Sequence, residues 1–332
     1  MLTTLVVPLD GSVLGDRALS FAIRLVRATN GRLILVRAGL TQKVCGLDDT
    51  VLTLLAETRR AATELAAVAE RLRAAGIAVE TCVRYDDAAQ AIADVARERQ
   101  ADLVVMSMLG ASGVGRSVYG SVVEGVLRRT DVPVLLVPTV CETTWPTSRA
   151  LRVLLPLDGS AAAEAALGPA LALGQALGGE LLLVHVLPAT PTGVETSAAS
   201  DYLDAVSTVV GRLAPALPLR VHVLPHTTLA AVVRELGADV IALTTRGRGG
   251  TTRLSGGTAT DTLRRACVPV LLVRPTAAQA DGVVFPEESL ALRASPAPTG
   301  DGKTAGQPSG WSREALRGEP GRPARGAERE RG

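Results

Sequence analysis

The sequence is poor in aromatic residues, because its 332 residues include only two Trp, three Tyr and two Phe. A hydrophobic core must therefore be built mainly from Leu, Val, Ile and Ala. The formal net charge is only +2, which argues against a surface that binds nucleic acid. The chain length is typical of about two domains.

Cysteine is also scarce, and the chain has no Cys-x-x-Cys pair. The four cysteines are scattered at Cys45, Cys82, Cys141 and Cys267. This pattern indicates a reducing cytoplasmic environment rather than a disulfide framework or a zinc site. The first residues have no basic region typical of a signal peptide. The most apolar stretch, residues 165–186, is broken by Gly, Pro, Gln and Glu, so we expect no membrane span.

Several motifs of common enzymes are missing as well. No G-x-S-x-G sequence is present, which argues against acyl hydrolysis. Neither of the two glycine-rich loops is followed by G-K-[ST], so neither is a Walker A site. His222 and His226 are four residues apart, but Pro225 and a predicted strand end separate them, so we expect no helical metal pair. His185 is interpreted as a strand residue. We assign no catalytic residue and no metal site formed by protein side chains alone.

An internal repeat organises the chain. Residues 5–12, Leu-Val-Val-Pro-Leu-Asp-Gly-Ser, return at 153–160 as Val-Leu-Leu-Pro-Leu-Asp-Gly-Ser. The sequence Val-Pro-Val-Leu-Leu-Val closes both copies, at 132–137 and 268–273. We therefore predict one domain over residues 1–138, a linker over 139–150, a second domain over 151–275 and a disordered tail over 276–332, where Gly, Pro, Arg, Glu and Ser dominate.

Each copy alternates short apolar runs with helical patterns. In the first copy we predict strands at 5–9, 33–36, 79–83, 103–106 and 134–137, with helices between them. The second copy repeats this order, with a shorter middle helix at about 199–214. Strands of this kind separated by helices indicate two tandem doubly wound α/β domains, each with a five-stranded parallel sheet and helices on both faces.

A glycine-rich loop follows the fourth strand in each copy. Gly110 and Gly120 in the first copy match Gly247 and Gly257 in the second, with the same spacing. A hydroxyl residue follows the last glycine of each loop and begins a predicted helix. Such a sequence turns backbone N–H groups toward a phosphate, and glycine lets a ligand approach the backbone closely.

The Asp-Gly-Ser sequence after the first strand allows two interpretations. Asp10 and Asp158 can accept hydrogen bonds from ribose hydroxyls or help to hold a divalent cation. Alternatively, each sequence forms a turn in which Ser12 or Ser160 caps the next helix. The Asp-Gly-Ser sequence occurs in both copies, each time together with a glycine loop, and this favours contact of the aspartate with a ligand. Ser121 and Thr258 can cap their helices, bind phosphate, or do both.

These motifs resemble the universal stress protein family. The resemblance rests on Pro-Leu-Asp-Gly-Ser at the start of each copy, the glycine loops and the closing strands. In the family motif G-x2-G-x9-G-[ST], Ser107 and Thr244 replace the first glycine. The resemblance implies a Rossmann-like, adenine-nucleotide alpha hydrolase-like fold, ATP binding, and pairing of two domains through their last strands. By motif, the implied nucleotide-binding residues are Pro8, Asp10, Ala38, Ser107, Gly110, Gly113, Gly120, Ser121, Val122, Pro156, Asp158, Val186, Thr244, Gly247, Arg248, Gly249, Gly250, Gly257, Thr258 and Ala259.

The resulting hypothesis is a cytoplasmic ATP-binding stress-response protein that acts by nucleotide-dependent binding rather than turnover. ATP is the expected cofactor, with Asp10 and Asp158 assisting any nucleotide-bound Mg²⁺. The expected partner is an unidentified protein, not nucleic acid or a membrane, and the two copies form an intrachain pseudo-dimer, with a further homodimer left open. A slow ATPase or autophosphorylating protein and a nucleotide-free interaction module are the alternatives. Arg246, Arg248 and Arg253 predict tighter ATP binding in the second copy.

Overall fold

The computed structural model describes residues 2–38, 50–109, 120–139, 145–245, 262 and 265–275. The predicted tail, Cys45 and Cys141 lie outside these residues, as do most of both glycine loops. None of the helices within the described ranges combines the length and the apolar character needed to cross a membrane.

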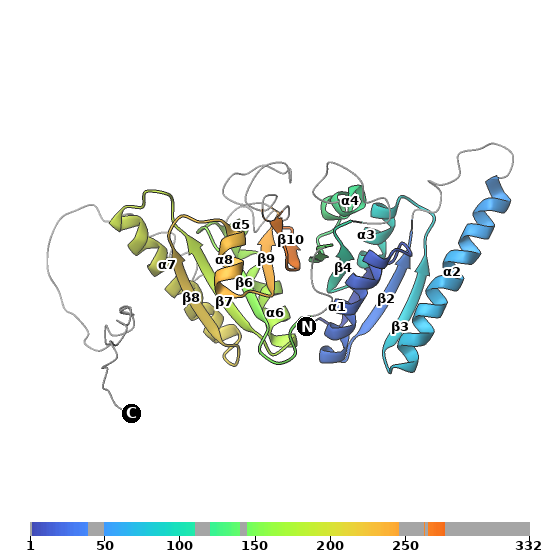
Figure 1. Cartoon of the computed structure of the whole chain (residues 1–332), viewed down its shortest axis with the longest axis horizontal. Helices are drawn as coiled ribbons and strands as arrows, with labels where there is room; N and C mark the ends of the chain where they lie inside the picture. Colours follow the sequence, from blue (N-terminus) through green and yellow to red (C-terminus); the bar gives the residue numbers. More distant parts are fainter. Residues whose placement is uncertain are drawn as a thin grey trace, which may run out of the picture. The chain divides into compact units, whose positions relative to one another are not determined.

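Each half of the chain alternates strands with helices (Figure 1). The elements of the first half are β1 Thr4–Pro8, α1 Val13–Thr29, β2 Arg32–Arg37, α2 Thr50–Ala74, β3 Ala78–Val83, α3 Ala88–Glu98, β4 Leu103–Ser107, α4 Ser121–Arg129 and β5 Val134–Val137. Those of the second half are β6 Arg152–Pro156, α5 Ala161–Glu164, α6 Leu167–Ala176, β7 Glu180–Val186, α7 Gly193–Leu213, β8 Leu219–Leu224, α8 Leu229–Leu236, β9 Val240–Thr244 and β10 Val270–Val273.

All of these strands belong to one ten-stranded sheet with the order β3-β2-β1-β4-β5-β10-β9-β6-β7-β8. Neighbouring strands within each half run parallel. The two halves meet where β5 pairs with β10 in antiparallel register, with Leu135 opposite Leu271. The predicted α/β fold is confirmed, and the two predicted five-stranded sheets are the halves of a continuous sheet.

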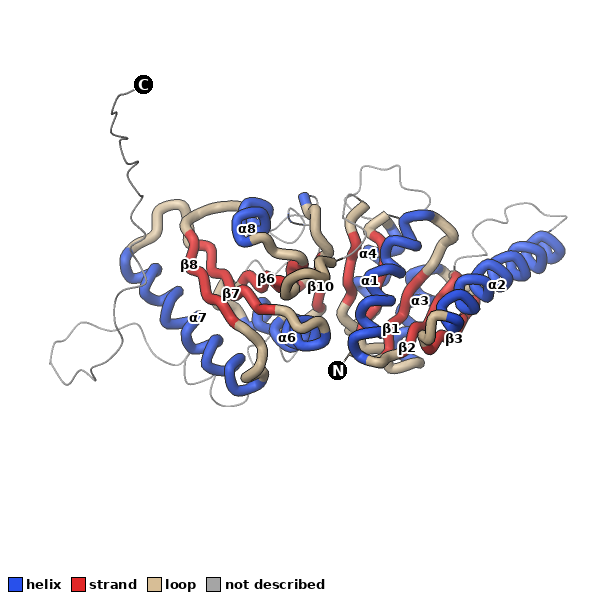
Figure 2. Tube along the Cα trace, turned by 60° about the horizontal axis from the view of Figure 1, so that its bottom comes forward, coloured by secondary structure: helices blue, strands red, loops and turns tan. Residues whose placement is uncertain are grey.

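Helices cover both faces of the sheet because strand side chains alternate between two cores. Leu5 and Val7 point toward the core that includes α1 and α2, whereas Val6 faces the core built with α3 and α4. In the second half, α6 and α7 cover the first face and α8 covers the other. Figure 2 shows these helices flanking the strands. Burial on both faces explains why the strand sequences are almost continuously apolar.

Local sequence signals place several helix ends correctly. Ser12 caps the start of α1, and Asn30 ends that helix in the left-handed conformation with a φ of 53°. The Asn30-Gly31 sequence is a signal for a helix stop, because asparagine tolerates this conformation better than most residues.

The predicted start of α7 is wrong. This helix begins at Gly193 rather than near residue 199. Thr192 and Glu195 form a capping box, in which the Glu195 N–H donates to Thr192 Oγ1 at 3.2 Å and the Thr192 N–H donates to Glu195 Oε2 at 2.8 Å. The Thr-x-x-Glu sequence is a recognised signal for a helix start, and it adds the first turn and a half that apolar periodicity overlooks.

Part of the predicted linker is a core residue. Trp145 is only 3% exposed and belongs to the same hydrophobic core as α1 and α6. The segment that connects the two copies therefore contributes one of the chain's few large aromatic side chains to the packing between them.

Candidate functional site

The order of the strands reverses between β1 and β4, and again between β6 and β9. In sheets of this kind, ligands bind beyond the carboxyl ends of the strands at such a reversal. Pro8 and Ser107 end β1 and β4, and Pro156 and Thr244 end β6 and β9. The structure thus brings these four predicted site residues to the two reversal points.

In the first copy, the Asp-Gly-Ser sequence forms a turn that leads into α1. Asp10 Oδ1 accepts a hydrogen bond from the Ser12 N–H at 2.9 Å, and Ser12 Oγ accepts one from the Gly15 N–H at 3.3 Å. Gly11 has a φ of +81°, which other residues rarely adopt. The turn-and-cap interpretation is therefore confirmed here.

The second copy repeats this turn. Asp158 Oδ1 accepts hydrogen bonds from the Ser160 N–H at 2.9 Å and from Ser160 Oγ at 2.6 Å. Ser160 Oγ in turn accepts from the Ala163 N–H at 3.2 Å, and Gly159 has a φ of +79°. Each aspartate orients its turn through Oδ1. A carboxylate has two oxygens and about four lone-pair sites, so one carboxylate can accept several hydrogen bonds at once.

Arg37, at the end of β2, brings a buried positive charge to the first of these turns. It is 8% exposed and forms an ion pair with Glu64 of α2. A Cβ added to Gly11 would lie 2.9 Å from Arg37 Nη1, so the guanidinium lies against the turn. Arg37 Nε is buried and has no hydrogen-bond partner among the described residues. From the sequence, the strand end at Arg37–Ala38 is expected at the site, but Ala38 rather than Arg37 is the binding residue predicted there, and the partner Glu64 is not predicted.

Histidine replaces this arginine in the second copy. Pro8 pairs with Val36 and Pro156 pairs with Val184, so the next residues along the second strands, Arg37 and His185, correspond. The His185 ring lies edge-on to Tyr202, with ring centroids 6.4 Å apart.

A buried carboxylate lies beyond this ring pair. Tyr202 donates a hydrogen bond to Glu164 Oε1 at 3.1 Å, and Glu164 is 3% exposed. The second strand therefore ends at a His–Tyr–Glu group in the second copy and at an Arg–Glu pair in the first. The two candidate sites are not chemically equivalent.

The first glycine loop starts and ends at one point beside β4. The Gly120 N–H donates to the Met108 carbonyl at 2.9 Å, and the Met108 N–H donates to the Val137 carbonyl at 2.9 Å. Ser107 Oγ donates to the Leu109 carbonyl at 2.7 Å. These bonds hold both ends of the loop at the carboxyl edge of the sheet.

Gly120 is the N-cap residue of α4, so of the roles left open for Ser121, capping this helix does not apply. Gly120 provides no side-chain hydrogen bond to the first turn, and Ser121 is the first helical residue and is exposed. Among the described residues, a Cβ added to Gly120 would have the Met108 carbonyl oxygen, at 3.8 Å, as its one neighbour within 4 Å. The N–H groups of this helix start therefore have no side-chain cap from Gly120.

The remaining predicted residues fall into two groups. Ala38, Val122 and Val186 are partly buried and pack against the core on the α3, α4 and α8 face. The residues outside the described part of the chain are Gly110, Gly113, Gly247, Arg248, Gly249, Gly250, Gly257, Thr258 and Ala259.

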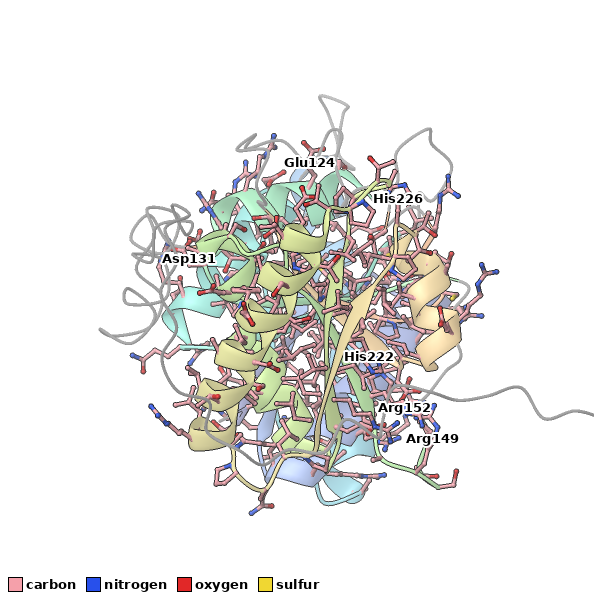
Figure 3. All side chains as sticks on the ribbon, turned by 90° about the vertical axis from the view of Figure 1, so that its left-hand side faces the viewer. Glu124, Asp131, Arg149, Arg152, His222 and His226 are labelled. Atoms are coloured by element: carbon pink, nitrogen blue, oxygen red, sulfur yellow. The ribbon has the colours of Figure 1, made fainter. Side chains whose placement is uncertain are left out.

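The two histidines considered as a metal pair lie on different kinds of structure. His222 lies within β8, whereas His226 follows the end of that strand, and Figure 3 shows the two apart along the sheet. The described residues include no cluster of three or more His, Cys, Asp or Glu side chains that could hold a metal ion.

Comparison with known proteins supports the repeat. The sequence profile of the universal stress protein family matches residues 1–138 and again residues 150–274. A universal stress protein from Mycobacterium tuberculosis is 28% identical over 187 residues, which are 53% of this chain and 62% of that relative. One from Mycolicibacterium smegmatis is 28% identical over 213 residues, covering 60% of this chain and 70% of the relative.

Solved structures show the same fold. The crystal structure of a universal stress protein from Archaeoglobus fulgidus aligns over 82% of this chain and 99% of its own, with a TM-score of 0.65 and 24% identity. The fold and the paired turns define a protein of two doubly wound α/β repeats. The chain belongs to the universal stress protein family.

Proposed function

We propose that this chain binds ATP at the carboxyl ends of its strands, with one site in each half. The reversal of strand order, the paired aspartate turns and the glycine loop anchored beside β4 support this proposal. Occupancy by ATP would order the glycine loops and change the surface offered to a protein partner. Binding, rather than turnover, would then be the function, and the protein would act in a cytoplasmic stress response.

The observation that carries the proposal is Arg37. A guanidinium that is 8% exposed needs a partner to offset its desolvation, and Glu64 supplies one. Its Nε has no partner among the described residues, and the Nη1 end of the guanidinium lies against the Gly11 turn at the strand reversal. A hydrogen bond from such a cation to a phosphate or base acceptor would contribute roughly 1.5–3 kcal/mol.

The aspartates fit a supporting role better than a catalytic one. Asp10 and Asp158 already accept hydrogen bonds from the serines of their own turns, which hold the carboxylates in place. A carboxylate accepts several hydrogen bonds at once, so each would also accept from ribose hydroxyls or from the hydration shell of a nucleotide-bound Mg²⁺. A Mg²⁺ ion would neutralise phosphate charge there.

Titration calorimetry with ATP, ADP and GTP tests the proposal. We expect ATP and ADP to bind and GTP to bind more weakly, and failure of every nucleotide to bind below millimolar concentration would overturn the proposal. Metal-dependent hydrolysis by the purified chain separates a binding protein from a slow ATPase. If the chain hydrolyses ATP, and if substitutions at Gly120 and Gly257 that block the two sites abolish this hydrolysis, the protein is an ATPase.

We also propose the division into residues 1–138, 139–150, 151–275 and 276–332. The two family matches, which end at residue 138 and resume at residue 150, support it. Because Trp145 is buried, the segment 139–150 also contributes to the hydrophobic core, in addition to connecting the two domains.

A further inference from the structure

A pocket of about 210 Å³ lies at the amino ends of β1 and β4, on the side of the sheet that α6 covers. This is the opposite end of the strands from the candidate nucleotide sites. Small-molecule sites usually measure roughly 300–1,000 Å³, so this pocket suits a single large side chain better than a ligand. Its lining residues are Leu2, Asp102, Leu103, Pro133, Gly168, Pro169, Ala172, Leu173 and Leu271.

The internal repeat provides a second copy of this pocket. The Thr4 N–H donates to Asp102 Oδ2 at 2.9 Å, and the Arg152 N–H donates to Asp239 Oδ2 at 2.8 Å. The Asp102 N–H donates to the Thr4 carbonyl at 2.9 Å, and the Asp239 N–H donates to the Arg152 carbonyl at 2.9 Å. Asp102 and Asp239 therefore occupy equivalent positions in the two halves.

The helices that border the two pockets also correspond. The serines that follow each aspartate turn cap α1 and α5 in the same way. Counted from these caps, Phe21 corresponds to Pro169, and Arg24 corresponds to Ala172. Each α6 residue that lines the open pocket thus has an equivalent residue on α1.

In the second copy, the side chain of Trp145 fills the equivalent position. Its indole lies edge-on to Phe21, with ring centroids 4.8 Å apart, and its Nε1–H donates to the Asp239 carbonyl at 3.2 Å. Arg24 donates to the Trp145 carbonyl and, at 2.6 Å, to the Pro146 carbonyl. The three residues that Trp145 contacts are the counterparts of Pro169, Ala172 and Asp102, which all line the open pocket.

A second interaction accompanies the indole in the filled pocket. Arg149, four residues after Trp145, donates to both carboxylate oxygens of Asp239 at 2.6 and 2.7 Å. Figure 3 shows Arg149 and Arg152 side by side at this end of the sheet. At the open pocket, Asp102 supplies the equivalent carboxylate. The occupant that matches the open pocket is therefore an indole followed by an arginine.

The chain has one other tryptophan, and its surroundings in the sequence resemble those of Trp145. Residues 145–152 read Trp-Pro-Thr-Ser-Arg-Ala-Leu-Arg, and residues 311–317 read Trp-Ser-Arg-Glu-Ala-Leu-Arg. Both contain Trp, then Ser-Arg, then Ala-Leu-Arg in the same order. We propose that the open pocket is a docking site for residues 311–317, with the indole of Trp311 in the pocket and an arginine paired with Asp102.

The length of the C-terminal segment permits this docking. Trp311 follows Pro275 by 36 residues, and a random coil of that length spans roughly 30–36 Å on average. The contacts would be weaker than those of Trp145, because Pro169 and Ala172 replace the aromatic ring and the guanidinium on α1. Because these residues are smaller, we expect the Trp311 segment to bind reversibly rather than to form a permanent part of the core.

The proposal is tested with a peptide of residues 309–318. The peptide is added, without nucleotide, to the full chain carrying the substitution Trp311→Ala. We expect binding in fluorescence anisotropy, and at least tenfold weaker binding when Ala172→Leu fills the pocket. Gln175→Leu is the matched control, because Gln175 is exposed on α6 and outside the pocket lining. Gly168→Phe is a second blocking variant, since an added Cβ there meets no atom of the described residues within 4 Å.

Two further comparisons identify the occupant. A peptide with alanine in place of Trp311 should bind at least tenfold more weakly. The unaltered chain should bind the peptide more weakly than the Trp311→Ala chain, because its own segment competes at a high effective concentration. Equal binding by these two chains would overturn the proposal, as would equal effects of Ala172→Leu and Gln175→Leu. Failure of nucleotide binding would leave these results unaffected.

Discussion

The indole of Trp145 packs edge-on against the ring of Phe21, with 4.8 Å between ring centroids and an angle of 82° between the ring planes. This contact joins the segment between the two repeats to α1 of the first repeat, while the indole N–H donates to the carbonyl of Asp239, the residue just before β9. Edge-to-face aromatic pairs stabilise a fold beyond the burial of their area. The linker is therefore a structural element of the interface between the repeats.

Replacing Trp145 with alanine should destabilise the protein by about 3–5 kcal/mol, because it leaves a cavity in a well-packed core. Urea denaturation followed by circular dichroism measures this loss. Exposed Val194 on α7 provides a matched control, since Val194→Ala removes apolar atoms that are 75% exposed. A loss below about 1 kcal/mol for Trp145→Ala would contradict the packing role.

Removing the charge of Arg37 should weaken nucleotide binding in the first site. Arg37→Met keeps much of the side-chain stem but loses the guanidinium, and we expect the Kd for ATP there to rise about tenfold or more. Arg60→Met is the control, because Arg60 also pairs with Glu64 but is largely exposed. Titration calorimetry compares the two, and equal Kd values would show that Arg37 does not contact the nucleotide.

Blocking one glycine loop at a time should distinguish the two sites. Gly120→Trp should abolish ATP binding in the first half with little loss of stability, since among the described residues an added Cβ meets one atom, at 3.8 Å. Gly257→Trp should abolish the second site. Arg246, Arg248 and Arg253 predict that the second site is the tighter one, although Arg37 gives the first site a cation that this ranking omits.

Calorimetric titration of the two variants, with folding checked by circular dichroism, measures the remaining site in each. Tighter binding by the Gly257→Trp variant than by the Gly120→Trp variant would contradict the ranking. It would indicate that Arg37, rather than the loop arginines, determines the affinity.

Stability should fall as the pH drops below neutrality, in part because of His222. Burial lowers the pKa of His222, as does nearby Arg220, and Glu235 and Glu180 only partly oppose this. The unfolded chain then binds a proton more readily than the folded chain, so this contribution is complete above the unfolded pKa of ~6.5 and is lost as the pH falls through that value. His222 Nε2 also has no hydrogen-bond partner among the described residues.

The midpoint of urea denaturation, measured between pH 5 and 7.5, tests this expectation. His222→Val should flatten the profile, since valine suits a strand and does not titrate. Glu195 provides an internal control: its hydrogen bonds from Thr192 lower its pKa, so its contribution is lost only in more acidic solution, below the pKa of an ordinary glutamate. An unchanged profile in the His222→Val protein would contradict the assignment.

Features that depend on neighbouring residues along the chain could be predicted from the sequence. The strands follow short apolar runs, Ser12 and Asn30 mark the ends of α1, and the repeated Asp-Gly-Ser turns place Asp10 and Asp158 beside the strand reversals. These features follow from local physics, because apolar periodicity, capping hydrogen bonds and positive φ angles each involve only a few consecutive residues.

The pairing of side chains from distant elements could not be predicted in this way. Arg37 meets Glu64 only because α2 packs against β2, and Trp145 reaches Phe21 and Asp239 only because the two repeats form one sheet. The sequence by itself determined the repeat, the fold class and the turns. The tertiary structure decided which charges face the site and which of two equivalent pockets holds an indole, because these depend on packing between residues far apart in the chain.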